Sequence, residues 1–339
     1  MASTTDPSPL YALRDGSYVS DLLIAAIAEL DLFTFLAGRP RVPSEICKAM
    51  DLVPEPVDVM CTLFLALGLI ERSGEALEPT PLAREHLVAG SEYDLRAYFA
   101  SLSDRPAVAE LLGVLRSGKP AAWASAGAGK TWEERLAEPD FGEHITAAMD
   151  ARGRYLAPLL ADALGDLEVQ HVLDVAGSSG IYASALVDKR PGLRADVLER
   201  APVDSAARAL LDRRGYTGRV GVVAGDMFED PLPQGYDLHL YSHVLHDWDD
   251  ESVRGLVRKS FDSLASGGWI ADHDAHLAAD KAGPLSVAAY SVLLMHSTEG
   301  RCRSTAEITA LFEEAGFEDV RTRSTGIDRS AVIAQKPRR

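Results

Sequence analysis

The chain has 339 residues and a formal net charge of −17. This length predicts two domains, each with enough apolar residues to build a core. So acidic a surface repels phosphate backbones and anionic lipids, which argues against a nucleic-acid or membrane partner and favours a small-molecule ligand.

Cysteine usage and the N-terminal sequence point to a cytoplasmic protein. The three cysteines, Cys47, Cys61 and Cys302, are odd in number and show no CxxC pairing, so neither a disulfide framework nor a zinc ribbon is indicated. The segment MASTTDPSPL lacks the charged and apolar regions of a signal peptide, and no uncharged apolar run reaches membrane-spanning length.

The first 100 residues predict a helical, winged-helix-like domain. Apolar residues recur every three or four positions over 10–36, which indicates a helix. Two shorter helices follow in VPSEICKAMDL and PEPVDVMCTLFLALGL, and LIERSGEALEPT reads as a hairpin turning at Ser73–Gly74. Because the second helix carries Asp58, Cys61 and Leu63 instead of basic residues, a protein contact surface is favoured over DNA binding.

Residues 101–165 predict a helical linker that contributes to the substrate pocket. The segment AAWASAGAGK at 121–130 contains GAGK, but no strand precedes it and Gly118 lies too far upstream for a phosphate-binding loop. PDFGEHITAAMDARGRYLAPLLADAL then predicts a long amphipathic helix leading into the next domain.

Residues 166–339 predict an α/β domain with a doubly wound, Rossmann-like sheet. VQHVLDVAGSSG, IYASALVDKR and LRADVLER read as strand, helix and strand, which is a βαβ unit of a parallel sheet. The alternation continues through RVGVVAGDMF, YDLHLYSH and GGWIADHDAHL, and the chain ends in an antiparallel pair, FEDVRTRSTG and SAVIAQKP.

A glycine loop and two acidic residues at strand ends predict a nucleoside site. The loop DVAGSSG has the spacing GxxG, which lacks the full GxGxxG of a dinucleotide site and favours a nucleoside without a pyrophosphate. A carboxylate after the second strand can accept ribose hydroxyls, and one after the third can accept an adenine amine, with an apolar side chain against the ring. The candidate cofactor-binding residues are Asp174, Gly177, Gly180, Glu199, Asp226 and Met227, with Phe228 as the alternative to Met227.

The motifs LDVAGSSG, VLER, AGDMF, HVLHDWDDE and GRCRSTAEI together resemble the class I S-adenosylmethionine-dependent methyltransferases of the small-molecule O-methyltransferase family. The resemblance covers nearly the whole chain. It implies that residues 1–100 are a dimerisation domain and that the chain forms a homodimer. It also implies that S-adenosyl-L-methionine is bound through Asp174, Gly177, Glu199 and Asp226. It also implies that His246 of LHDWDD stands where the family has its general base.

The chain departs from the family pattern at three positions. Asp274 replaces the usual glutamate after the fifth strand, Cys302 replaces a second glutamate, and His296 stands where an apolar residue is usual. His246, Asp274 and His296 would make a 2-His-1-carboxylate site for a divalent transition metal such as Fe, Zn, Ni or Co. The segments LHD and MHSTEG also resemble those of phenylpyruvate C-methyltransferase, which belongs to the metal-binding α-keto acid C-methyltransferase subgroup.

Metal-dependent C-methylation at the β-carbon of an α-keto acid in secondary-metabolite biosynthesis is therefore the expected reaction, because a metal stabilises the enolate that attacks. With His246 as a ligand, His243, Asp247 or metal-bound hydroxide would take the proton. His273 and His276 are spare candidates, with His276 ranked first. The residues expected to line the substrate pocket are Met149, Arg152, Tyr290 and Met295, with Arg152 first for a substrate carboxylate.

Two rival functions remain open. O-methylation of a phenolic or enolic small molecule needs no Lewis acid and would use His246 as a free general base. A non-catalytic DNA-binding regulator would use the winged helix, although the acidic surface and the intact cofactor loop both count against it.

Overall fold

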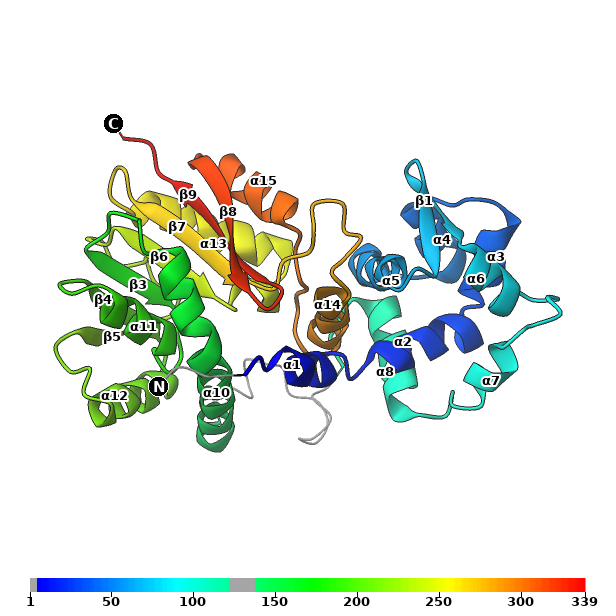
Figure 1. The fold of residues 1–339 in the computed structure, drawn as a ribbon, viewed down its shortest axis with the longest axis horizontal. Helices are drawn as coiled ribbons and strands as arrows, with labels where there is room; N and C mark the ends of the chain where they lie inside the picture. The colour runs from blue at the N-terminus through cyan, green and yellow to red at the C-terminus, as the bar shows by residue number, and fades with distance from the viewer. Residues whose placement is uncertain (1–4, 122–137, 339) are drawn as a thin grey trace. The chain divides into compact units, whose positions relative to one another are not determined.

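The computed structural model describes residues 5–121 and 138–338, which form two compact units (Figure 1). The sheet unit consists mainly of residues 129–276 and 303–339, and the helical unit of residues 7–128 and 277–302. The GAGK segment lies outside the described residues. Among the described residues, no helix combines the length and the apolar character that a membrane crossing requires.

The division differs from the expected ranges 1–100, 101–165 and 166–339, because the range 101–165 is shared between the two units. In addition, residues 277–302 follow the last parallel strand in sequence, but they belong to the helical unit. The reason is the helix α14 (Leu285–Ser297), which is buried along almost its whole length and packs against α1 (Ser8–Asp15) and α5 (Pro54–Ala66). A helix that is apolar on all sides must be enclosed by other helices.

The single helix expected over 10–36 is interrupted. Asp31 adopts a left-handed conformation with φ 46°, which ends one helical segment and begins the next. The segments of this part are α1, α2 (Val19–Ile24), a π-helical segment (Ala25–Glu29) and α3 (Leu32–Gly38).

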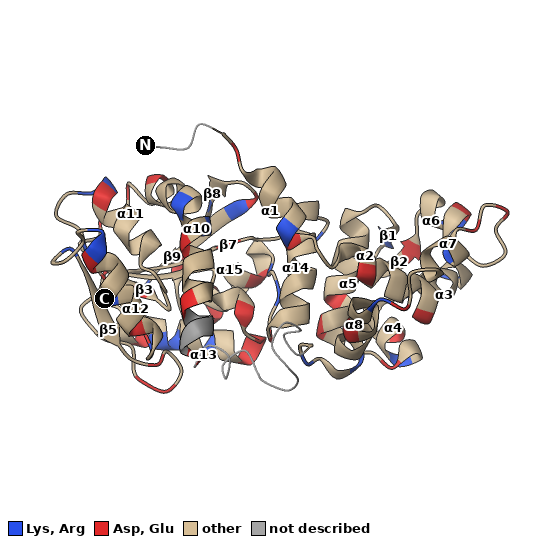
Figure 2. Ribbon diagram, turned by 90° about the horizontal axis from the view of Figure 1, so that it is seen from below, with Lys and Arg blue, Asp and Glu red and all other residues tan. Residues whose placement is uncertain are grey.

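The winged-helix arrangement that the sequence predicts is present. It consists of α4 (Pro43–Met50), α5, and the hairpin of β1 (Ile70–Ser73) and β2 (Ala76–Pro79), in which Ser73 pairs with Ala76. The charged residues of α5 are Glu55 and Asp58, both acidic (Figure 2). The remaining helices of this unit are α6 (Pro81–His86), α7 (Arg96–Ala100) and α8 (Pro106–Ser117).

The sheet unit confirms the doubly wound α/β fold. Its seven strands lie in the order β5-β4-β3-β6-β7-β9-β8. The strands from β5 to β7 are parallel, and β9 is antiparallel to both of its neighbours, β7 and β8. The strands are β3 (His171–Val175), β4 (Arg194–Glu199), β5 (Val220–Ala224), β6 (Leu238–Ser242), β7 (Trp269–Asp274), β8 (Glu318–Gly326) and β9 (Arg329–Gln335). The helices are α10 (Pro139–Ala163), α11 (Ile181–Lys189), α12 (Val203–Arg213), α13 (Asp250–Ser263) and α15 (Thr305–Ala315).

The core of the sheet unit fixes where the candidate site forms. Buried apolar side chains join the sheet to α13 and α15, among them Tyr241, Val257, Ile308 and Phe312. The strand order reverses between β3 and β6, and in such sheets ligands bind beyond the carboxyl ends of the strands at that reversal. The glycine loop after β3 and the histidines after β6 therefore begin at the same edge.

Candidate active site

The histidine-rich segment leaves the sheet in a constrained conformation. His243 follows β6 with φ 57°, a left-handed conformation that is uncommon for a residue with a side chain. Its N–H donates to the carbonyl oxygen of His273 at 2.9 Å. A short 3₁₀ turn over Leu245–Asp247 then carries His246, and the Asp249 side chain caps α13 by accepting from the N–H of Ser252 at 2.8 Å.

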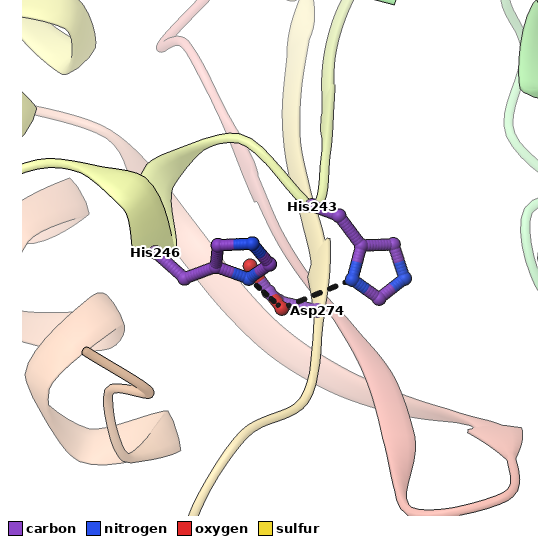
Figure 3. Close-up of side chains that lie close together, drawn as sticks. All are labelled: His243, His246 and Asp274. Carbon is purple, nitrogen blue, oxygen red and sulfur yellow. Dashed lines mark hydrogen bonds and ion pairs between the residues drawn. The ribbon is translucent and has the colours of Figure 1, made fainter. Parts of the chain in front are cut away.

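His246, His243 and Asp274 converge at the ends of two adjacent parallel strands (Figure 3). The His246 Nδ1 lies 2.7 Å from Asp274 Oδ1, and the His243 Nδ1 lies 3.3 Å from the same oxygen. Asp274 also accepts from the N–H of Ala275 at 2.7 Å. On the other edge of the ring, the His246 Nε2 is 3.5 Å from Asp247 Oδ1. The structure thus brings together four of the residues that the sequence singled out: His243, His246, Asp247 and Asp274.

The electrostatics of this cluster separate the two histidines. Burial lowers the pKa of His246, but the negative charges of Asp274 and Asp247 outweigh it, and the pKa is raised overall. Burial and the nearby Arg152 guanidinium hold the pKa of His243 well below its usual value. Burial alone would raise the pKa of Asp274, but His246 and His243 hold it well below its usual range, whereas burial raises the pKa of Asp247 to about 6. His246 is therefore the more basic imidazole.

His296 has its own partners within the helical unit. Its Nε2 lies 2.8 Å from Glu110 Oε2, and its ring stacks on that of Tyr18 with centroids 4.0 Å apart. Tyr290 and Met295, both expected in the substrate pocket, are buried on the same helix, α14.

A compact set of possible metal ligands differs from the expected one. Within residues 5–121 and 138–338, the three ligand atoms that lie within 4.8 Å of one another belong to His243, His246 and Asp274. Coordination by His246, Asp274 and His296 remains a prediction.

The glycine loop is closely packed over Asp174. A Cβ at Gly177 would lie 2.4 Å from the Asp174 carboxyl carbon, so a side chain cannot be accommodated there. The Asp174 carboxylate accepts from the N–H of Ala183 at 3.3 Å, and burial raises its pKa to about 7. Gly180 has φ 69° and caps the start of α11. The predicted loop and its acidic residue are thus one tightly packed element.

The acidic residues after β4 and β5 lie at the same sheet edge. Glu199 accepts from the N–H of Ser178 in the glycine loop at 2.8 Å, and burial raises its pKa to about 7. Asp226 accepts from the N–H of Phe228 at 2.8 Å and so shapes the turn after β5. Met227 packs partly buried against the apolar core. Their roles in cofactor binding remain predictions.

The helix α10 is fixed against the glycine-loop side of the sheet unit. Asp150 accepts two 2.6 Å hydrogen bonds from Arg214, and a Cβ at Gly153 would lie 2.4 Å from Ile181 Cγ2. This anchoring places Arg152, a half-buried residue, near the active-site histidines, where its charge lowers the pKa of His243. Met149 lies half-buried one turn earlier on the same helix.

The structure also shows contacts that the sequence did not indicate. His273, ranked below His276 as a spare candidate, lies beside His243, with ring centroids 5.3 Å apart. His276 instead lies 3.0 Å from Asp272 Oδ2, because β7 ends at Asp274 and the alternation of faces stops there. Arg303 was not among the site residues predicted from the sequence. Its charge and its place directly after Cys302, where the family pattern is altered, were the available signal.

Comparisons with known proteins identify the family of the chain. A family model described as the O-methyltransferase domain matches residues 109–318. The tetracenomycin polyketide synthesis 8-O-methyl transferase TcmO of Streptomyces glaucescens is 30% identical, covering 98% of this chain and 97% of that protein. The 3-hydroxy-5-methyl-1-naphthoate 3-O-methyltransferase of Streptomyces sahachiroi is 29% identical over 93% of this chain and 91% of its own. A crystal structure of an O-methyltransferase family 2 protein from Planctomyces limnophilus in complex with apigenin superposes with a TM-score of 0.86 at 30% identity, covering 99% and 98% of the two chains.

Proposed function

The chain belongs to the O-methyltransferase domain family and is an S-adenosylmethionine-dependent methyltransferase, and from this premise we propose that it methylates a phenolic or enolic hydroxyl of a small molecule in secondary-metabolite biosynthesis. The names of two bacterial relatives, an 8-O-methyl transferase of tetracenomycin polyketide synthesis and a 3-O-methyltransferase of a hydroxylated naphthoate, support an aromatic acceptor. Both names specify transfer to oxygen. This proposal therefore takes precedence over the C-methylation that the sequence favoured.

The observation that carries the proposal is the hydrogen bond between His246 and Asp274. With Nδ1 bound to the carboxylate at 2.7 Å, the ring is held so that Nε2 can accept the proton of a substrate hydroxyl. The charge of Asp274 then stabilises the imidazolium that forms. S-adenosylmethionine, when bound, supplies an electrophilic methyl group on its sulfonium. The hydroxyl oxygen would gain the methyl group and its proton would go to His246, while the broken carbon–sulfur bond would leave the donor as an uncharged thioether.

The residues at the sheet edge fit this methyl donor. Glycine at position 177 lets the loop turn tightly over the Asp174 carboxylate, and Glu199 is a half-buried carboxylate joined to the loop through the N–H of Ser178. We propose that Asp174, Gly177 and Gly180 form the cradle, and that Glu199 and Asp226 accept from the ribose and the adenine. Met227 would lie against the adenine ring.

The proposal is tested with a panel of hydroxylated aromatic acids and polyketide-like phenols, measuring methyl transfer by mass spectrometry. Wild-type protein should methylate at least one phenol, and His246→Ala should lower kcat by about 10² to 10⁴, the usual contribution of a general base. His239→Ala is a matched control, because that buried histidine bonds Ser260 inside the core instead of the active site. A His246→Ala variant with undiminished kcat would refute the role of the base.

Metal-dependent C-methylation of an α-keto acid is the second candidate, and one observation favours it. The ligand atoms of His243, His246 and Asp274 lie within 4.8 Å of one another, and two imidazoles and a carboxylate suit Fe, Zn, Ni or Co. A bound metal would supply a Lewis acid that polarises a carbonyl group. Metal analysis of protein prepared without chelator, followed by assays on aromatic and branched α-keto acids, separates the two candidates. His296→Ala would abolish activity only if His296 is a ligand.

We also propose a homodimer that does not bind nucleic acid. Leu10 and Leu13 on α1 are 68% and 77% exposed, which favours burial against another copy of the chain. Light scattering coupled to size exclusion tests the dimer, and Leu13→Glu should shift it to monomers.

The charged residues of α5 are both acidic, which argues against binding of DNA by this helix. A gel shift at low salt with tight, sequence-specific binding would instead support a regulator.

A further inference from the structure

Arg303 is a buried arginine that binds the backbone on both sides of His246. Its side chain is 2% exposed. Nη1 donates to the carbonyl oxygen of Leu245 at 2.8 Å, and Nη2 donates to that of Trp248 at 2.8 Å. Nη2 and Nε also donate to Asp250 Oδ1 at 2.8 and 3.0 Å. One guanidinium therefore joins the residue before His246, the end of its turn and the start of α13.

The turn that carries His246 packs against the apolar core through Val244 and Leu245, but its backbone is held by weak hydrogen bonds. Its own backbone hydrogen bonds are long, 3.2 Å from the Asp247 N–H to the carbonyl of Val244 and 3.4 Å from the Trp248 N–H to that of Leu245. The backbone of the segment is bonded to the sheet upstream, through the N–H of His243, and the His246 side chain is bonded to Asp274 at the end of β7. A strained left-handed residue followed by a weakly bonded turn is a conformation that the surroundings must impose. The bonds from Arg303 are the shorter ones and supply that restraint.

The chemistry of arginine suits this task. A charged side chain is costly to bury unless all its hydrogen bonds are made. The rigid planar fork of a guanidinium bonds several acceptors in fixed directions, which a lysine ammonium on a flexible stem does not. The two carbonyl oxygens and the carboxylate on Asp250 match that fork. A residue needed only to neutralise Asp250, which is 41% exposed, would not have to be buried.

We propose that Arg303 is a positioning residue for the general base: it fixes the turn so that the His246 ring meets Asp274 on one edge and the acceptor hydroxyl on the other. Asp274 orients the imidazole through Nδ1, and Arg303 sets the place of the backbone from which the imidazole extends. The inference rests on the proposed function of His246. It assigns Arg303 no contact with the substrate or the methyl donor.

Kinetics of Arg303 variants test the proposal. Arg303→Ala should lower kcat by about 100-fold, the effect of misplacing a catalytic group by about 1 Å, while the dissociation constant of S-adenosylmethionine stays within about twofold. Arg303→Lys keeps the charge without the fork and should lose about tenfold. Methylguanidinium added to Arg303→Ala should restore part of kcat. A folded Arg303→Ala variant whose kcat is unchanged, or falls only with loss of donor binding, would overturn the proposal.

Two controls separate positioning from general packing. Arg258→Ala removes another arginine bond to a carbonyl, from α13 to Ala315 at 3.3 Å, and should leave kcat unchanged. Asp250→Asn retains an oxygen acceptor and both carbonyl bonds, so kcat should change by less than about threefold. If Asp250→Asn lowered kcat as much as Arg303→Ala does, the ion pair between Arg303 and Asp250 would be the important interaction, and the proposed positioning of the turn would be wrong.

A spectroscopic measurement keeps the proposal testable if the acceptor class is wrong. With ¹⁵N-labelled histidine, the Nδ1–H proton of His246, bonded to Asp274, should give a downfield imidazole signal, assigned by its loss in His246→Gln. This signal should broaden or exchange faster in Arg303→Lys and Arg303→Ala, and stay sharp in Arg258→Ala. Failure of the wild type to methylate any hydroxyl would refute the proposed function alone. An unchanged signal in folded Arg303→Ala would refute the positioning role alone.

Discussion

Replacing Asp274 by asparagine should change both the rate and its pH dependence. The substitution keeps an oxygen that can accept from the His246 Nδ1 at the present 2.7 Å, but it removes the negative charge. A charge-assisted hydrogen bond contributes about 1.5–3 kcal/mol and a neutral one about 0.5–1.5 kcal/mol. The difference of about 1–1.5 kcal/mol corresponds to a loss of roughly tenfold in kcat.

The direction of the pH shift follows from the charges around His246. In the wild type the charges of Asp274 and Asp247 raise the pKa of His246 against the lowering effect of burial. Activity requires the neutral imidazole, so it rises as the pH passes upward through that pKa. Asp274→Asn removes the larger raising charge, the pKa falls, and the acid limb of kcat moves to lower pH.

Kcat measured across pH for both proteins gives the answer, with Asp196→Asn as the control. Asp196 is a carboxylate on β4 that bonds His171 at 2.7 Å and Tyr236 at 2.9 Å instead of His246. The control should keep the wild-type acid limb. An acid limb in Asp274→Asn that stays in place or moves to higher pH would refute the role assigned to the carboxylate.

Further predictions concern the cofactor loop, the core and the metal. Gly177→Ala should abolish binding of S-adenosylmethionine by calorimetry, because the new Cβ would lie 2.4 Å from the Asp174 carboxyl carbon. Burial raises the pKa of Asp174 to about 7 in the folded protein, from 3.8 in the unfolded chain, so the folded protein binds this proton more tightly. The stability of the unliganded protein should therefore fall as the pH rises from 3.8 to about 7. Melting curves of Asp174→Asn should show a smaller loss of stability over this pH range. Gly153→Ala should lower the free energy of unfolding by about 1–3 kcal/mol in denaturant titrations, since its Cβ overlaps Ile181. Chelator treatment should leave O-methylation unchanged, and recovery of full activity only with added metal would favour the second candidate.

The sheet and its site edge could be predicted because they follow from local patterns. Each parallel strand is a short run rich in apolar residues that is ended by Gly, Asp, Glu or His, and the alternation with helices allows few topologies. His246 and Asp274 follow strands that are neighbours in the observed order, so their meeting was foreseeable from the sequence. The same reasoning placed the glycine loop, Glu199 and Asp226 at one edge.

Features that depend on long-range packing could not be predicted in this way. The apolar pattern over 10–36 carries no signal for the left-handed Asp31, and helix propensity alone favours continuity there. The helix α14 joins the helical unit because of partners far away in sequence. His296 bonds Glu110, which is 186 residues away, and Arg303 bonds Trp248, which is 55 residues away.

The site to which the methyl group is transferred tests the central claim most directly. The protein is incubated with S-adenosylmethionine carrying a ¹³C-labelled methyl group, together with hydroxylated aromatic acids and aromatic α-keto acids, and the product is examined by carbon NMR. The account predicts a methoxy carbon on an aromatic or enolic oxygen, formed without added metal and lost in His246→Ala. A labelled methyl group on the β-carbon of an α-keto acid would contradict it.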